Sequence, residues 1–174
     1  MKRCLLLLLS LLLPSLLSAE FSVGDVPSSI TIQGEGGGRI DGSSWSSSHL
    51  MGQLTLLTYV DPDERDLNEN AMKAIDELKI SKDQLKRVSI INMDATWIPS
   101  SLIKKGLKDA QKEKMDTIFV MDMEKSLVKK WDLEDDSNDI LIISSKGRVL
   151  FSKDGELSEK DIKNMLVVLK ENLP

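Results

Sequence analysis

Cysteine is nearly absent from this chain. The single thiol, Cys4, lies within a short apolar segment close to the N-terminus. Disulfide exchange and peroxide reduction both use a thiolate as the nucleophile, and a carboxylate does not replace it. If the segment that carries Cys4 is removed on export, the remaining chain has no disulfide bond and no thiol chemistry.

Histidine is also scarce, and the sequence has no cluster of basic residues. His49 is the only histidine. A lone imidazole does not form an ordinary zinc site, and no Gly-x-Ser-x-Gly motif is present for it to activate, so we expect His49 on the surface without a catalytic role. The formal net charge is −5 and nothing basic is clustered. This balance argues against binding to DNA or RNA, because that affinity comes mostly from neutralising phosphates.

Residues 1–19 have the layout of a secretory signal peptide. Lys2 and Arg3 precede an apolar run from Leu5 to Leu13, and small residues follow. The run is shorter than the ~20 residues that a membrane-spanning helix needs. We therefore predict cleavage before Glu20 and no membrane anchor in the mature protein.

Strands and amphipathic helices alternate after residue 50. The predicted strands are residues 53–60, 88–92 and 117–121, with a hairpin of 140–144 and 148–152. The predicted helices are residues 66–79, a segment that begins near residue 99, and a closing helix after the capping box of Ser158 and Asp161. This order predicts an α/β fold with a central mixed sheet flanked by helices, ending in a hairpin and a helix.

Two segments give weaker patterns. In the Gly/Ser-rich residues 20–48, we expect a short hairpin between Ser29–Gln33 and Arg39–Ile40. We also expect Leu127–Trp131 to form a strand paired with residues 117–121.

Four stretches resemble one protein family. They are Ser44–Val60 (SWSSSHLMGQLTLLTYV), Ile90–Pro99 (IINMDATWIP), Leu127–Leu133 (LVKKWDL) and Ile140–Leu157 (ILIISSKGRVLFSKDGEL). These stretches are similar to the YtfJ-like family of small periplasmic proteins. The resemblance implies a thioredoxin-like three-layer sandwich in the periplasm of a Gram-negative bacterium. The family has no established activity, so it implies no catalytic residue and no cofactor.

The predicted organisation has three parts: a signal peptide (1–19), a Gly/Ser-rich N-terminal segment with short strands (20–48) and a thioredoxin-like domain (49–174). Where active thioredoxins place Cys-x-x-Cys, this chain has the acidic loop Asp61–Asp66. Ser137-Asn138-Asp139 stands where their cis-proline is expected. Both halves of the thiol site are therefore missing from the sequence.

Two acidic loops are predicted to meet at one edge of the sheet. Loops that follow the carboxyl ends of parallel strands line the ligand crevice of open α/β sheets. We define the acidic rim as the six candidate residues Asp61, Asp63, Asp66, Asp135, Asp136 and Asn138. The hypothesis is that the rim binds a cation or a basic partner segment. The alternative is that these are solvated turn residues, because Asp and Asn favour turns for backbone reasons.

Specific metal sites have little support in the sequence. A calcium loop that starts at Asp61 and Asp63 has Arg65 in its third position and Met72 where a bidentate Glu is needed. Met121 and Met123, with Met115 nearby, suggest Cu(I) ligation, but packing explains their spacing equally well and we favour it. We therefore assign no metal ligand.

The three tryptophans are the remaining large side chains of interest. We expect Trp45, Trp97 and Trp131 to be partly buried anchors. An exposed tryptophan would instead mark a binding surface.

The favoured interpretation is a periplasmic binding or accessory protein with no catalysis of its own, no cofactor and a protein partner. The alternative is a non-thiol enzyme, or a cation-binding protein, that uses the acidic rim. An enzyme of this kind needs a concave pocket with convergent carboxylates of raised pKa. A binding module needs an exposed apolar patch or sheet edge.

Export makes a measurable prediction. Intact-mass analysis of the protein from the periplasmic fraction is expected to give a chain that begins at Glu20. Iodoacetamide treatment of the unfolded protein should then leave that mass unchanged, because Cys4 has been removed. A full-length mass with one alkylated thiol would show that the segment is retained.

Overall fold

The strand β4 (Thr55–Val60) lies inside the main sheet, and its mostly apolar side chains are buried on both faces of the sheet. Only Thr58 among its residues is not fully buried. β4 pairs in parallel with β5 (Lys86–Asn92) and antiparallel with β7 (Asn138–Ile143). The computed structural model describes residues 21–174, so the predicted signal peptide falls outside the described residues.

Six strands form the main sheet, in the order β2-β6-β5-β4-β7-β8. The three not yet named are β2 (Gly37–Arg39), β6 (Thr117–Asp122) and β8 (Val149–Lys153). Parallel pairing joins β4, β5 and β6, whereas β2, β7 and β8 pair antiparallel. The predicted mixed sheet with a C-terminal hairpin is confirmed.

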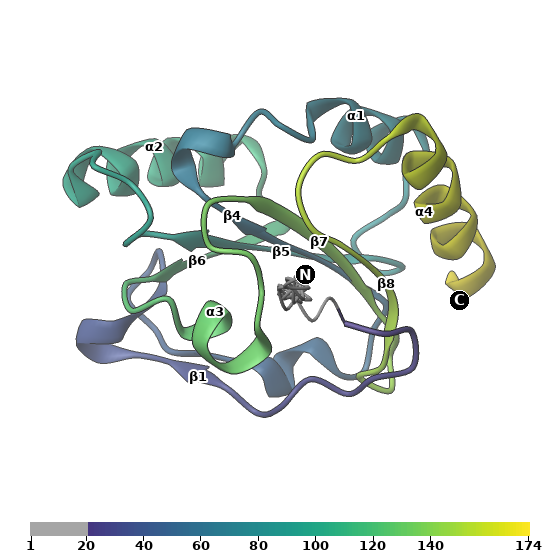
Figure 1. The fold of residues 1–174 in the computed structure, drawn as a ribbon, viewed down its shortest axis with the longest axis horizontal. Helices are drawn as coiled ribbons and strands as arrows, with labels where there is room; N and C mark the ends of the chain where they lie inside the picture. Colours follow the sequence, from purple (N-terminus) through teal and green to yellow (C-terminus); the bar gives the residue numbers. More distant parts are fainter. Residues whose placement is uncertain (1–20) are drawn as a thin grey trace, which may run out of the picture.

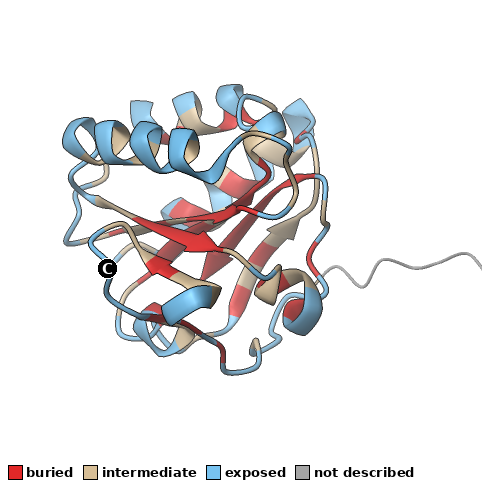
Figure 2. Cartoon of the chain, turned by 90° about the vertical axis from the view of Figure 1, so that its left-hand side faces the viewer, coloured by how far each residue is buried: buried red, intermediate tan, exposed pale blue. Residues whose placement is uncertain are grey.

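Helices cover one face of the sheet and a mixed layer covers the other (Figure 1). The upper layer contains α1 (Glu69–Glu77), α2 (Ser100–Glu113) and α4 (Glu159–Asn172). The lower layer contains α3 (Ser126–Trp131) and the N-terminal segment with β1 (Thr31–Ile32) and β3 (Trp45–Ser46). The strands are buried between these layers, and the helices expose their outer faces (Figure 2).

The pleat of the strands divides the core into two sides. Leu57 and Tyr59 of β4 pack in the lower core with Trp45, whereas Leu56 packs in the upper core with Ile75 of α1. Successive side chains of a strand point to opposite faces, so one continuous apolar run supplies both cores. The capping box at the start of α4 is present as predicted, with Ser158 accepting from the Asp161 N–H.

The predicted strand at Leu127–Trp131 is wrong, because these residues form α3. The chain turns after β6 through Lys125, whose φ is +53°. Asp122 at the end of β6 then accepts a hydrogen bond from the Leu127 N–H at 3.1 Å. Leu127 and Trp131 are four residues apart and both buried, which is the spacing of one helix face.

The predicted hairpin in the N-terminal segment is also wrong. Thr31 pairs with Ser46 rather than with Arg39 or Ile40, and β2 instead adds to the edge of the main sheet beside β6. Gly37 has a φ of +117°, and a Cβ there would collide with the carbonyl oxygen of Met121. The glycine cluster therefore permits a close approach of two backbones rather than a hairpin turn.

Asn68, just before α1, joins three segments of the chain. Its Nδ2 donates to the carbonyl oxygens of Asn138 (2.8 Å) and Gly155 (2.9 Å), and its Oδ1 accepts from the Leu157 N–H (2.9 Å). The side chain is only 3% exposed. A buried backbone N–H or C=O group without a hydrogen-bond partner is costly. The Asn68 amide supplies the partner for three such groups near the ends of β7 and β8.

We expect Asn68→Ala to lower the free energy of unfolding by about 3 kcal/mol, because it leaves three buried backbone groups without their side-chain partner. Urea unfolding measures the change. The matched control, Asn70→Ala, removes an exposed amide and should change stability by less than about 0.5 kcal/mol. Equal stability of the two variants would contradict the assignment.

Candidate functional site

The two acidic loops meet at the carboxyl end of β4, as predicted. The Asp61 N–H donates to the Ser137 carbonyl oxygen at 2.8 Å. The amide of Asn138 donates to the carbonyl oxygens of Glu64 (3.1 Å) and Arg65 (3.4 Å). Asn138 is buried and therefore holds the loops together rather than facing a ligand.

Asp61 is a structural member of the acidic rim. It is 3% exposed, and its Oδ1 accepts from the Asp63 N–H at 2.8 Å, which caps the 3₁₀ turn of residues 62–64. Burial raises the pKa of Asp61, and the charges of Asp63 and Asp136 raise it further. These charges place the two loops within electrostatic reach of each other.

Asp63, Asp66 and Asp136 are the members of the rim that face solvent. Asp66 contacts the Arg65 guanidinium at 3.4 Å in an exposed ion pair, which contributes little to stability. Asp63 accepts a hydrogen bond from the Thr96 hydroxyl at 2.8 Å, and this contact joins the rim to the loop after β5.

Asp135 lies on the other side of the rim and is paired. Its Oδ2 accepts from Lys125 Nζ at 2.7 Å and its Oδ1 accepts from Asn92 Nδ2 at 2.9 Å. Burial acts to raise the pKa of Asp135, but the hydrogen bonds from Lys125 and Asn92 outweigh it and the pKa is lowered. Of the six predicted rim residues, Asp61, Asp135 and Asn138 are therefore buried or half-buried in internal contacts, and the other three are exposed.

Trp97, in the loop after β5, is the most exposed tryptophan of the chain. It is 87% exposed, whereas Trp45 and Trp131 are buried, so the expectation of three anchors is wrong for Trp97. Its neighbour Thr96 donates a hydrogen bond to Asp63, which places this part of the loop at the rim. The polar context between Asp94 and Pro99 was the signal in the sequence that this tryptophan is not a core residue.

A buried polar row lies beneath the rim, on the lower face of the sheet. Tyr59 and Asp139 are register partners on β4 and β7, and the Tyr59 hydroxyl donates to Asp122 Oδ2 at 3.4 Å. Asp139 is fully buried and accepts from the Glu134 N–H at 3.1 Å. Sequence reasoning missed this row, because Asp122 and Asn92 lie at the ends of strands that look purely apolar.

Asp139 titrates far from its ordinary range. Burial raises its pKa to about 7, and the nearby charge of Asp154 adds to the rise, while hydrogen bonds from Ser137 and from the Gly155 and Glu134 N–H groups oppose it. Burial next to Asp122 raises the pKa of Tyr59 as well, so its hydroxyl stays protonated. Neither group faces an open pocket.

The histidine and the methionines considered as metal ligands lie on the surface or in the core. His49 is exposed, as expected, with its Nδ1 3.4 Å from an Arg39 guanidinium nitrogen. Met121 and Met123 pack in an apolar cluster at the end of β6, whereas Met115 is 85% exposed. Within residues 21–174, no three acidic, histidine or cysteine side chains are arranged to hold a metal ion.

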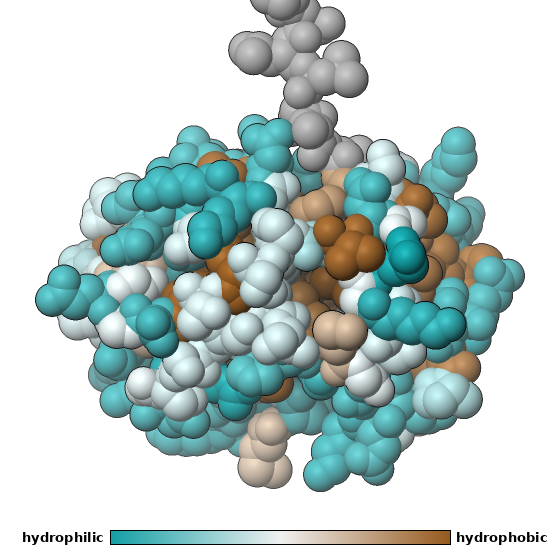
Figure 3. All heavy atoms as spheres, turned by 90° about the horizontal axis from the view of Figure 1, so that it is seen from below, coloured by the Kyte–Doolittle hydropathy of each residue, from teal (hydrophilic) through white to brown (hydrophobic). Residues whose placement is uncertain are grey.

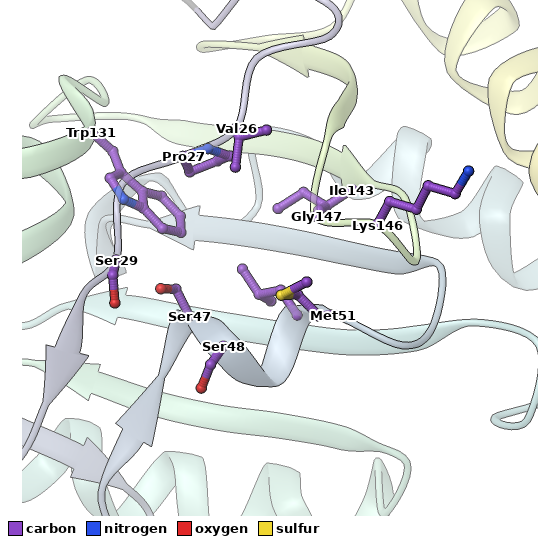
Figure 4. Close-up of a pocket in the computed structure, with 11 residues that line it drawn as sticks. Val26, Pro27, Ser29, Ser47, Ser48, Met51, Trp131, Ile143, Lys146 and Gly147 are labelled. Carbon is purple, nitrogen blue, oxygen red and sulfur yellow. The ribbon is translucent and has the colours of Figure 1, made fainter.

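Two hollows lie outside the rim. The α1–α2 groove, of about 440 Å³, crosses the upper face of the sheet and reaches the rim at Asp66 and Asn138. The lower pocket, of about 200 Å³, is lined by residues of the segments 26–29 and 47–51 together with Trp131 and Ile143, and both apolar side chains and serines contribute (Figure 4). Apolar atoms are visible in a hollow of that lower face in Figure 3.

None of the helices within residues 21–174 is both long and apolar enough to cross a bilayer.

The raised pKa of Asp139 predicts a pH dependence of stability. The folded state holds this proton up to about pH 7, whereas the unfolded chain releases it near 3.8. Between these values the folded state binds more protons, so the free energy of unfolding falls as the pH rises from about 4 to 7. At ~1.4 kcal/mol per pKa unit, the fall is on the order of 4 kcal/mol.

Urea unfolding at several pH values tests this. Asp139→Asn should remove the fall and be more stable than the natural chain at pH 8, while the exposed-site control Asp83→Asn should retain it. A natural chain with constant stability over this range would contradict the assignment.

The comparisons with known proteins confirm the predicted fold. A thioredoxin-like structure, the pneumococcal exposed lipoprotein thioredoxin Etrx1 of Streptococcus pneumoniae, matches with a TM-score of 0.59 at 14% identity, covering 83% of this chain and 99% of that chain. A thiol-disulfide isomerase of Corynebacterium glutamicum matches with a TM-score of 0.59 at 16% identity, covering 87% and 96%.

A sequence relative extends over nearly the whole chain. The uncharacterized protein YtfJ of Escherichia coli (strain K12) is 26% identical over 181 residues, which cover 98% of each chain. Residues 28–172 also match the family described as "Bacterial protein of unknown function (YtfJ_HI0045)". The resemblance seen in the sequence is confirmed, and the chain belongs to this YtfJ_HI0045 family of bacterial proteins.

Proposed function

We propose that this chain is an exported, periplasmic binding protein without catalysis of its own, which holds a basic segment of a partner protein on its acidic rim and Trp97. The observation that carries the proposal is the exposed indole of Trp97, which directly follows Thr96, the residue whose hydroxyl donates to Asp63. Tryptophan is enriched where proteins bind one another, and its ring face attracts Lys and Arg. Carboxylates beside the ring add attraction for the same side chains.

The distribution of charge supports a cationic partner. Asp63, Asp94 and Asp136 are exposed on the rim and its adjacent loop. Lys125 forms an ion pair with Asp135, and the charges of Asp94 and Asp136 also act on it. One lysine does not balance this group of carboxylates, so further counter-charge is favourable there. A basic segment would supply that counter-charge.

The carboxyl groups with raised pKa values favour binding over catalysis. Asp61 and Asp139 are 3% and 0% exposed, so a substrate in the rim would not reach them as a general acid or base needs to. The position that carries cysteines in active thioredoxins is here the capped turn that begins at Asp61. The proposed protein therefore uses the substrate side of the fold for binding alone.

A short fluorescein-labelled peptide rich in Lys and Arg tests the rim by fluorescence anisotropy. We expect Asp63→Asn with Asp136→Asn to weaken binding at least about tenfold, and Trp97→Ala to weaken it by a similar factor. Higher salt should weaken binding to the natural chain, because exposed charges are screened.

The matched control replaces two exposed carboxylates elsewhere, Asp83→Asn with Glu171→Gln, and should change binding less than about twofold. Equal losses in the two double variants would show that only net charge matters. Unchanged binding in Trp97→Ala would remove the indole from the site.

A further inference from the structure

The α1–α2 groove is the larger hollow described above, and it has an apolar floor. Its floor comes from Val60 on β4, Ile91 on β5 and Phe119 on β6. Two hydroxyls lie among them, with Thr58 Oγ1 donating to Ser89 Oγ at 3.1 Å. A volume of about 440 Å³ falls within the range of small-molecule pockets.

The helix α2 leaves its apolar face partly uncovered along this groove. It contains no buried residue, whereas α1 buries Ala71 and Ile75. Leu107 and Ala110 of α2 line the groove and are half-buried. An apolar ligand in the groove would remove this surface from water, which is favourable in proportion to the area covered.

Charged side chains of both signs line the groove, and among its cations Arg87 lies on β5 at the end away from the rim. The Arg87 side chain is only 17% exposed, and its guanidinium makes one ion pair, with Asp76 Oδ1 at 2.8 Å. Asp76 itself is 62% exposed, so solvent screens this pair. A guanidinium has five N–H donors, so Arg87 retains donors that an anionic group in the groove can use.

We infer that the α1–α2 groove binds a small amphipathic molecule with a single anionic group, which Arg87 holds while the apolar body lies over Phe119 and against α2. Carboxylate, sulfonate and phosphate headgroups share this chemistry, because each presents planar or clustered oxygens to a guanidinium. The inference goes beyond the proposed peptide binding and rests on different side chains, so either can fail without the other.

The fluorescent probe 8-anilinonaphthalene-1-sulfonate, which has an aromatic body and one sulfonate, tests the groove in the mature chain. Its emission should rise on binding. Decanoate should displace it at concentrations at least about tenfold lower than decan-1-ol, because only decanoate supplies an anion to Arg87. Equal potency of the two competitors would overturn the assignment of Arg87.

Two variants locate the site. Arg87→Gln should abolish the preference for decanoate, and Ala110→Trp should abolish probe binding by filling the groove from α2. Their matched controls are Lys146→Gln, which removes a cation from the lower pocket, and Lys108→Trp, on an exposed face of α2. Both controls should bind as the natural chain does.

Thermal melting shows whether each variant is folded. If Arg87→Gln does not fold, Ala110→Trp still decides the position of the site, because α2 has no buried residue to disturb. Probe binding that survives Ala110→Trp, or a loss seen with Lys146→Gln instead of Arg87→Gln, would overturn the inference. Absence of probe binding to the natural chain would overturn it as well.

Discussion

Two buried asparagine amides hold the carboxyl end of the sheet together. Asn138 donates to the loop after β4, and Asn68 connects the start of β7 to the segment between β8 and α4. Each amide side chain has both N–H donors and an oxygen acceptor. It can therefore hydrogen-bond to backbone groups that have no partner within the β-sheet. Neutral hydrogen bonds therefore join the two loops that carry the acidic rim, and the ion pair of Lys125 with Asp135 adds to them.

This arrangement explains how many carboxylates coexist at one edge. Asp61 and Asp135 are tied to backbone or side-chain donors, and Asp139 is buried at the cost of a raised pKa. Only Asp63 and its exposed neighbours present charge to solvent. The rim therefore combines a rigid base with an exposed outer surface on which carboxylates outnumber the cations Arg65 and Lys125, a charge balance that complements a cationic segment.

The rim and the α1–α2 groove adjoin each other but differ in chemistry. The rim is polar and charged, whereas the groove has an apolar floor with charged residues at its margins, among them the partly buried Arg87. The two adjoin where Asp66 and Asn138, which belong to the rim, also line the groove.

The sequence by itself determined the layers, the central strand and the lack of a Cys-x-x-Cys motif, because these follow from periodicity and from residues that are absent. It also determined that two acidic loops meet, since strand order places them. Only the tertiary structure decided that Leu127–Trp131 is a helix, that Asn138 is internal and that Trp97 is exposed. The last two outcomes depend on contacts between residues far apart in the chain, such as Asn138 with Glu64 and Thr96 with Asp63, which local patterns do not encode. The helix α3 depends on a closer contact, in which the Leu127 N–H donates to Asp122 after the turn at Lys125.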